Sequence, residues 1–208
     1  MIKRVIFDVD DTLINFPDSY IYETKKILTK FGIDASSVNL YEIIGEYEVL
    51  SKNKYYNKES LLEMINSSAH LNLTNEFVDA FFEMYDKLIT PLEAGVIETL
   101  EYLKNKYELV VLSNWFTDSQ KSRLKEAGIL EYFDEVYGTD IIPMKPSKEC
   151  FLRVIGDLKP EECVMVGDSL DADIKVPYEM GMNVFHLNKF GTSKYPTIRA
   201  IKDLKERL

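Results

Sequence analysis

The amino-acid sequence predicts an α/β fold in which a Rossmann-like parallel sheet, flanked by helices, carries a small all-helical domain. Beyond residue 91, short apolar runs alternate with helical patterns, which is typical of parallel strands joined by crossover helices. Between residues 18 and 88 the pattern is helical, with almost no strand-like runs. The chain of 208 residues, 46% of them hydrophobic, is long enough to bury a substantial core.

The individual elements follow from the spacing of apolar residues. The run at residues 5–7 predicts the first strand. Ile21, Ile27 and Phe31 then fall at helical spacing, and Gly32 supplies a stop. Helical patterns predict three further helices, over residues 40–50, 60–69 and 74–89. Later apolar runs predict the remaining strands, near residues 109–112, 135–137, 163–166 and 183–187.

Acidic residues follow the first strand directly. Asp8 and Asp10 lie two residues apart, so on an extended backbone their side chains share one face. Two like charges this close repel each other unless a cation lies between them or one carboxyl stays protonated for proton transfer. A polar turn is the alternative, because Asp and Thr are ordinary turn and N-cap residues. This segment alone supports both interpretations.

Two later segments carry side chains that can bind an anion. Ser113 and Asn114 follow the predicted strand at 109–112 and offer a hydroxyl and an amide. Either residue could instead cap the helix expected to begin near Thr117. Lys145 precedes a proline, and a lone lysine is most often a solvated surface residue.

A second acidic segment follows the predicted strand at 163–166. Asp168 and Asp173 lie here within the run Gly-Asp-Ser-Leu-Asp-Ala-Asp. A calcium-binding loop needs oxygen ligands at alternating positions followed by glycine. Counted from Asp168, those positions hold Leu170 and Ala172, so the sequence excludes a calcium loop.

Read in order, these segments are Asp-x-Asp-x-Thr, Ser-Asn, Lys-Pro and Gly-Asp-Ser with a further Asp. They resemble the four motifs of the haloacid-dehalogenase-like (HAD) hydrolase superfamily, in its phosphatase branch. The resemblance extends from Ile2 to about Leu187. It implies that Asp8 is the nucleophile, Asp10 the general acid/base and Lys145 the countercharge. It also implies two ligand sets: Thr12, Ser113, Asn114 and Lys145 for phosphate, and Asp8, Asp10, Asp168 and Asp173 for Mg²⁺, with Asp173 bound directly or through water.

The implied roles predict a magnesium-dependent phosphatase that hydrolyses a small phosphorylated metabolite, such as a sugar phosphate or a nucleotide, through an aspartyl-phosphate intermediate. Asp10 would protonate the leaving group and then deprotonate the hydrolytic water. Mg²⁺ and Lys145 would reverse the negative charge that otherwise repels a phosphate. Dehalogenases of the superfamily carry no aspartate at the position of Asp10, so dehalogenation is not expected. Asp11 stands where the family very often has glycine, and aspartate tolerates unusual backbone angles.

Two alternative functions remain open. A phosphomutase of the same family would pass the phosphoryl group to a second sugar hydroxyl instead of to water. A non-enzymatic phospho-accepting signalling protein would use the phosphorylated aspartate to change partners. Signalling receivers are shorter and carry no helical insert behind the nucleophile, so the segment 18–88 argues against that class.

The helical segment matches, in place and type, the cap that members of the superfamily insert after the first motif. The expected domains are a core of residues 1–16 and 91–208 and a cap of residues 17–90. Because the cap would shape the leaving-group pocket, Tyr55 and Tyr56 are candidates for its wall or rim. Trp115, the single tryptophan, either narrows this pocket or packs in the core.

Charge and hydropathy exclude several classes of partner. The net charge of −10 disfavours nucleic acid and anionic membranes. No apolar run approaches the roughly 18 residues of a membrane span, and the first residues lead into a strand rather than a signal peptide.

Cys150 and Cys163 form no metal-ligand spacing and require no disulfide, and His70 and His186 receive no role. We expect a cytoplasmic enzyme whose partner is a small-molecule phosphomonoester; the oligomeric state is not predicted.

Overall fold

A parallel sheet of six strands forms the centre of the computed structural model, which describes residues 1–16, 19–50, 57–88 and 90–208, with residues 46–50 described by their backbone alone. Its order is β3-β2-β1-β4-β5-β6. The strands are β1 (Arg4–Phe7), β2 (Glu108–Leu112), β3 (Glu135–Tyr137), β4 (Cys163–Gly167), β5 (Asn183–Leu187) and β6 (Thr197–Ile198). The α/β fold class and all the predicted strands are confirmed. The edge strand β6 was missed, because two residues are too few to form a periodic pattern.

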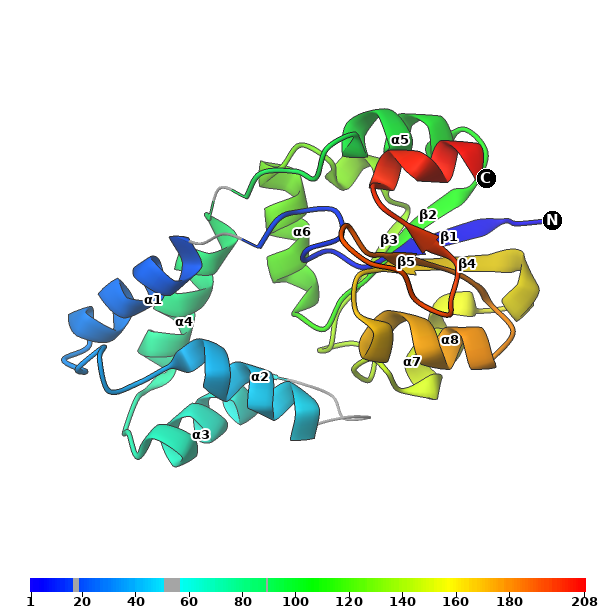
Figure 1. Cartoon of the computed structure of the whole chain (residues 1–208). Coiled ribbons are helices and arrows are strands. Elements are labelled where there is room, and N and C mark those ends of the chain that lie inside the picture. The colour runs from blue at the N-terminus through cyan, green and yellow to red at the C-terminus, as the bar shows by residue number, and fades with distance from the viewer. Residues whose placement is uncertain (17–18, 51–56, 89) are drawn as a thin grey trace.

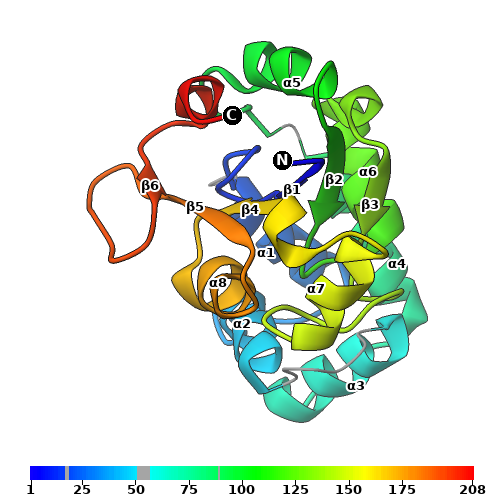
Figure 2. The same cartoon turned by 90° about the vertical axis from the view of Figure 1, so that its right-hand side faces the viewer.

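Both faces of the sheet are covered (Figures 1 and 2). The helices that cover them are α5 (Val96–Lys104), α6 (Thr117–Glu126), α7 (Lys148–Ile155), α8 (Lys175–Glu179) and the C-terminal 3₁₀-helix (Ile201–Glu206). Alternate residues of β1 face opposite sides: Val5 and Phe7 join the apolar cluster with α5, α6 and the C-terminal helix, and Ile6 joins the cluster with α7 and α8. This double burial explains why the strands read as continuous apolar runs.

The strand order brings the sequence motifs to one edge of the sheet. β1 pairs with β2 on one side and with β4 on the other. Because all three strands are parallel, the residues that follow them emerge at the same carboxyl edge. The chain order of the strands thus changes direction at β1, and in open α/β sheets ligands bind at such a point. Asp8, Ser113 and Asp168, which are far apart in the sequence, therefore meet there.

Residues between β1 and α5 form a helical unit beside that edge (Figures 1 and 2). Its helices are α1 (Ser19–Lys30), α2 (Leu40–Leu50), α3 (Lys58–Ala69) and α4 (Asn75–Asp86). All four were predicted, although α3 begins two residues earlier than expected and α4 ends earlier. They share one apolar cluster, which Trp115 and Phe116 join from the sheet side. The boundaries 17–90 stay a prediction, and Tyr55 and Tyr56, predicted for the pocket, lie outside the described residues.

The chain enters and leaves the helical unit through two segments that lie side by side. The main-chain N–H of Asn15 donates to the oxygen of Pro91 at 2.9 Å, and that of Glu93 donates to the oxygen of Leu13, also at 2.9 Å. This double connection fixes where the helical unit meets the sheet. Within the part of the chain that the structure describes, no helix is long and apolar enough to span a membrane.

Candidate active site

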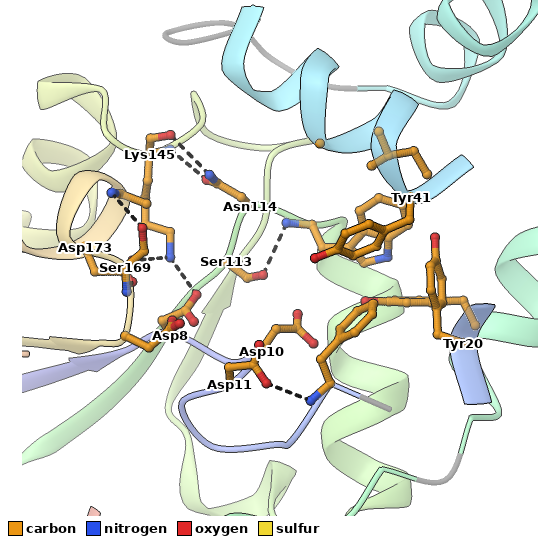
Figure 3. Close-up of a pocket in the computed structure, with 17 residues that line it drawn as sticks. Asp8, Asp10, Asp11, Tyr20, Tyr41, Ser113, Asn114, Lys145, Ser169 and Asp173 are labelled. Atoms are coloured by element: carbon orange, nitrogen blue, oxygen red, sulfur yellow. Dashed lines mark hydrogen bonds and ion pairs between the residues drawn. The ribbon is translucent and has the colours of Figure 1, made fainter. Parts of the chain in front are cut away.

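A cavity of about 330 Å³ lies at the carboxyl edge of the sheet (Figure 3). Its polar lining comes from the loops after β1, β2 and β4 and from Lys145. Its apolar lining comes mainly from five aromatic residues, which are Phe16, Tyr20, Tyr41, Tyr85 and Trp115. A ligand in this cavity would therefore meet charges at one end and rings at the other.

Lys145 brings a buried positive charge to the polar end. Its Nζ lies 2.6 Å from Oδ1 of Asp8 and 2.7 Å from Oδ1 of Asp173, and its side chain is 2% exposed. Burial alone would lower the pKa of Lys145, but Asp173 and Asp8 outweigh that effect and raise it. The lysine for which the family resemblance implied a countercharge is thus a buried, charged partner of two carboxylates.

Three carboxylates meet beside Lys145. Oxygen atoms of Asp8, Asp168 and Asp173 lie within 4.8 Å of one another. Burial, and then the charge of Asp173, raise the pKa of Asp168 to about 6. Burial also raises the pKa of Asp8 above its ordinary range, although Lys145 opposes this. Mg²⁺ prefers oxygen ligands, so this donor set fits the ion. The carboxylate of Asp10 is outside this group, and its place among the ligands stays a prediction.

The turn after β4 brings Asp173 back to the sheet. Residues Leu170–Ile174 form a single π-helical turn, a rare conformation that is frequent at functional sites. The N–H of Ser169 donates to Oδ2 of Asp173 at 3.0 Å, and Oγ of Ser169 accepts from the N–H of Ala172 at 3.2 Å. A Cβ atom on Gly167 would lie 2.4 Å from Cγ of Asp173. Only glycine therefore leaves room for this carboxylate.

Thr12 and Asp11 shape the loop after β1. Thr12 is fully buried, and its Oγ1 donates to Oδ2 of Asp8 at 3.2 Å, so it orients that carboxylate. Its predicted contact with phosphate stays a prediction. Asp11 has a φ of 58°, in the left-handed region that the family's glycine would adopt readily, and its Oδ1 accepts from the N–H of Phe16 at 3.0 Å. This hydrogen bond gives the extra carboxylate a local structural role.

Ser113 and Asn114 do not cap α6, whose N-cap is Phe116 with no side-chain hydrogen bond. Oγ of Ser113 accepts from Nε2 of Gln120 at 2.8 Å. Asn114 exchanges two hydrogen bonds with the main chain of Lys145: its Oδ1 accepts at 2.8 Å and its Nδ2 donates at 3.1 Å. Asn114 therefore braces the segment that presents Lys145. Both residues line the cavity, and their predicted contacts with phosphate stay predictions.

Comparison with known proteins identifies the family. A family model of haloacid dehalogenase-like hydrolases matches residues 2–177. The chain belongs to this family. The glyceraldehyde 3-phosphate phosphatase of Methanopyrus kandleri is 32% identical in an alignment 197 positions long; the alignment covers 88% of this chain and 82% of that protein. The pyrimidine 5'-nucleotidase PynA of Streptococcus pneumoniae is 24% identical, with 89% and 84% covered. The crystal structure of the HAD-hydrolase YfnB from Bacillus subtilis bound to magnesium has the same fold, with a TM-score of 0.81 at 19% identity over 100% of this chain and 98% of that one.

In this HAD-like hydrolase, Asp10 is held by two residues that the sequence analysis missed. Arg123 donates from Nη2 to Oδ1 of Asp10 at 2.7 Å and from Nη1 to Oδ2 at 3.1 Å. Gln120 donates to Oδ2 of Asp10 at 3.0 Å. Both residues lie on α6 and are buried. Their spacing of three on a helix was visible, but charged helical residues are usually exposed, so the spacing carried no signal without the fold.

Trp115 of the hydrolase fulfils both predicted alternatives, because it is buried and also borders the cavity. Its ring stacks on Phe82 of α4, with centroids 5.4 Å apart, and its Nε1 donates to Oγ of Ser119 at 3.0 Å. The tryptophan therefore joins the helical unit to α6. His186, which received no role, is buried with Nε2 2.9 Å from the main-chain oxygen of Asp168.

Proposed function

We propose that this HAD-like hydrolase is a magnesium-dependent phosphatase that hydrolyses a small phosphomonoester through an aspartyl-phosphate on Asp8. The observation that carries the proposal is the cluster of Asp8, Asp168 and Asp173 in the cavity lining, where Lys145 pairs with Asp8 and Asp173. Relatives named as phosphatases and a nucleotidase support it. Phosphoryl transfer depends chiefly on positioning and charge neutralisation, which is what this arrangement offers.

The reaction proceeds in two displacements at phosphorus. Asp8 attacks the phosphorus in line, the bond from phosphorus to the ester oxygen breaks, and Asp10 gives a proton to that oxygen. Asp10 then takes a proton from water, whose oxygen attacks the phosphorus and releases Asp8 and inorganic phosphate. Lys145 holds Asp8 in place throughout and offsets the phosphate charge. When bound, Mg²⁺ would be held by Asp8, Asp168 and Asp173 and would neutralise the remaining negative charge.

The apolar lining supports a leaving group with an aromatic or apolar surface. The rings of Phe16, Tyr20 and Tyr41 pack in edge-to-face and tilted arrangements with centroids 4.9 to 6.3 Å apart, and Tyr41 is 56% exposed. Among the described lining residues, Lys145 is the one cation, so a second anionic group on the substrate finds no partner there. Nucleoside monophosphates fit this lining better than compact polar sugar phosphates do, because a base offers a flat ring to the aromatic wall.

Release of inorganic phosphate from a panel of phosphomonoesters tests the proposal. We expect turnover with Mg²⁺, loss of turnover in excess chelator and little activity with Ca²⁺, which accepts more ligands at longer distances. Asp8→Asn should reduce turnover by at least about a thousandfold, because covalent catalysis contributes several kcal/mol. Asp171→Asn is the matched control, since this aspartate lies in the turn after β4 that also carries Asp173, with a side chain that is 76% exposed.

Four results would contradict the proposal. Activity of Asp8→Asn within about tenfold of wild type would refute the assignment of Asp8 as the nucleophile. Full activity in excess chelator would show that the reaction does not depend on a metal ion. Formation of a phosphorylated isomer without free phosphate would identify a phosphomutase, and stoichiometric phosphorylation without turnover would identify a signalling protein.

A further inference from the structure

We infer that Arg123, assisted by Gln120, is a positioning residue that fixes Asp10 for proton transfer to the leaving group. The inference rests on the proposed function, in which Asp10 is the acid and base. It assigns a role to two buried residues of α6 that lie outside the four sequence motifs.

The contacts leave Asp10 little freedom. Two parallel N–H···O bonds from one guanidinium, at 2.7 and 3.1 Å, fix both the position and the plane of the carboxylate. Gln120 adds a third bond to Oδ2 at 3.0 Å, and its own Oε1 accepts from Nη1 of Arg123 at 2.9 Å. Gln120 also donates to Oγ of Ser113. One network thus ties Asp10 to Ser113, a predicted phosphate-binding residue.

The burial of Arg123 indicates that this network serves Asp10. The side chain of Arg123 is 0% exposed, and a buried guanidinium is costly unless it is fully paired. Its Nε nevertheless has no hydrogen-bond partner in the described part of the chain. The ring of Tyr85 covers the guanidinium, with Cζ 4.5 Å from the ring centroid. The two Nη groups are therefore aimed at Asp10 although Nε remains unsatisfied.

The arrangement leaves one position on Asp10 for the proton. Oδ2 accepts two hydrogen bonds and Oδ1 accepts one, from Nη2 of Arg123. A carboxylate oxygen has two lone pairs, so Oδ1 keeps one. The side chain is 28% exposed and lines the cavity. Asp10 can thus give a proton from Oδ1 to the ester oxygen, and later accept one from water, while Arg123 stays bound.

Leaving-group dependence separates this role from a merely structural one. A nitrophenolate leaves readily without a proton, whereas an alkoxide needs one in the transition state. The test uses kcat/KM, which reports the steps up to departure of the leaving group and leaves out the later hydrolysis of the aspartyl-phosphate. Arg123→Met should therefore lower kcat/KM for an alkyl phosphate such as a nucleoside 5'-monophosphate by about 10²- to 10⁴-fold, the usual contribution of general acid catalysis. The kcat/KM for p-nitrophenyl phosphate should fall by less than about tenfold.

Further variants make the experiment decisive. Asp10→Asn should show the same selectivity, and the double variant should lose little more, since the two residues act as a unit. Arg123→Lys keeps a cation but not the two-point contact, so it should show a smaller selective loss and provides a second variant if Arg123→Met folds poorly. Lys125→Met, on the exposed face of α6, is the control.

Two outcomes would overturn the inference. Equal losses of kcat/KM on the two substrates, in a variant that retains the wild-type fold by circular dichroism, would make Arg123 a structural residue. Alkyl-phosphate activity within about threefold of wild type would show that Asp10 needs no positioning. The proposed function fails separately: active Asp8→Asn refutes it, whereas inactive Asp8→Asn with a non-selective Arg123→Met refutes only the positioning role.

Discussion

Replacement of Lys145 by methionine and of Asp8 by asparagine should change stability in very different ways. The site contains three carboxylates, from Asp8, Asp168 and Asp173, beside one buried ammonium. Lys145→Met preserves length and apolar packing but removes the charge that pairs with Asp8 and Asp173. Asp8→Asn is nearly isosteric and removes one of the mutually repelling charges.

The magnitudes follow from which charges are left unpaired. Removal of one partner of a buried ion pair typically costs about 3–5 kcal/mol, because the other charge stays buried without compensation. Lys145→Met leaves two such carboxylates, so we expect a loss at the upper end of this range. In Asp8→Asn, Lys145 keeps Asp173 at 2.7 Å, so we expect the free energy of unfolding to change by less than about 1 kcal/mol or to increase.

Urea unfolding at pH 7 in excess chelator measures both effects, because bound metal would otherwise compensate for the missing charge. Phe81→Leu, in the apolar cluster of the helical unit, reports the size of an ordinary packing loss in the same assay. A Lys145→Met variant within about 1 kcal/mol of wild type, or an Asp8→Asn variant that loses as much as Lys145→Met, would refute the electrostatic account of the site.

Two further predictions concern pH and Trp115. Burial raises the pKa of Asp168 to about 6, so the folded state favours the protonated acid. In chelator, the contribution of this group to the free energy of unfolding should be fully present below about pH 4 and should be lost as the pH rises through 6. Asp168→Asn should flatten this dependence in urea titrations at several pH values. An equally steep dependence in the variant would contradict the assignment. Trp115→Ala should lower the free energy of unfolding by about 3–5 kcal/mol in the same titration and should admit bulkier phosphomonoesters, and Trp115→Phe should lower it by less. A loss of under about 1 kcal/mol in Trp115→Ala would show that the ring is not part of the core.

The sequence by itself determined the α/β class, the predicted strands and the family. Continuous apolar runs at 5–7, 109–112 and 163–166 can be recognised locally, because strands buried on both faces need no partner to reveal their composition. The acidic motifs were recognisable because they follow those runs directly. A helical segment between the first two strands was equally visible, since helical periodicity is a property of neighbouring residues.

Only the tertiary structure decided how the side chains pair. The family resemblance implied that Lys145 is a countercharge, but only the fold showed that it lies between Asp8 and Asp173. Arg123 carried no signal until α6 was packed against the loop after β1. Asp10 and Arg123 are separated by 113 residues, and nothing local specifies their contact. Burial and long-range pairing depend on which elements become neighbours, and that is fixed by the strand order and the crossover helices rather than by any short stretch of sequence.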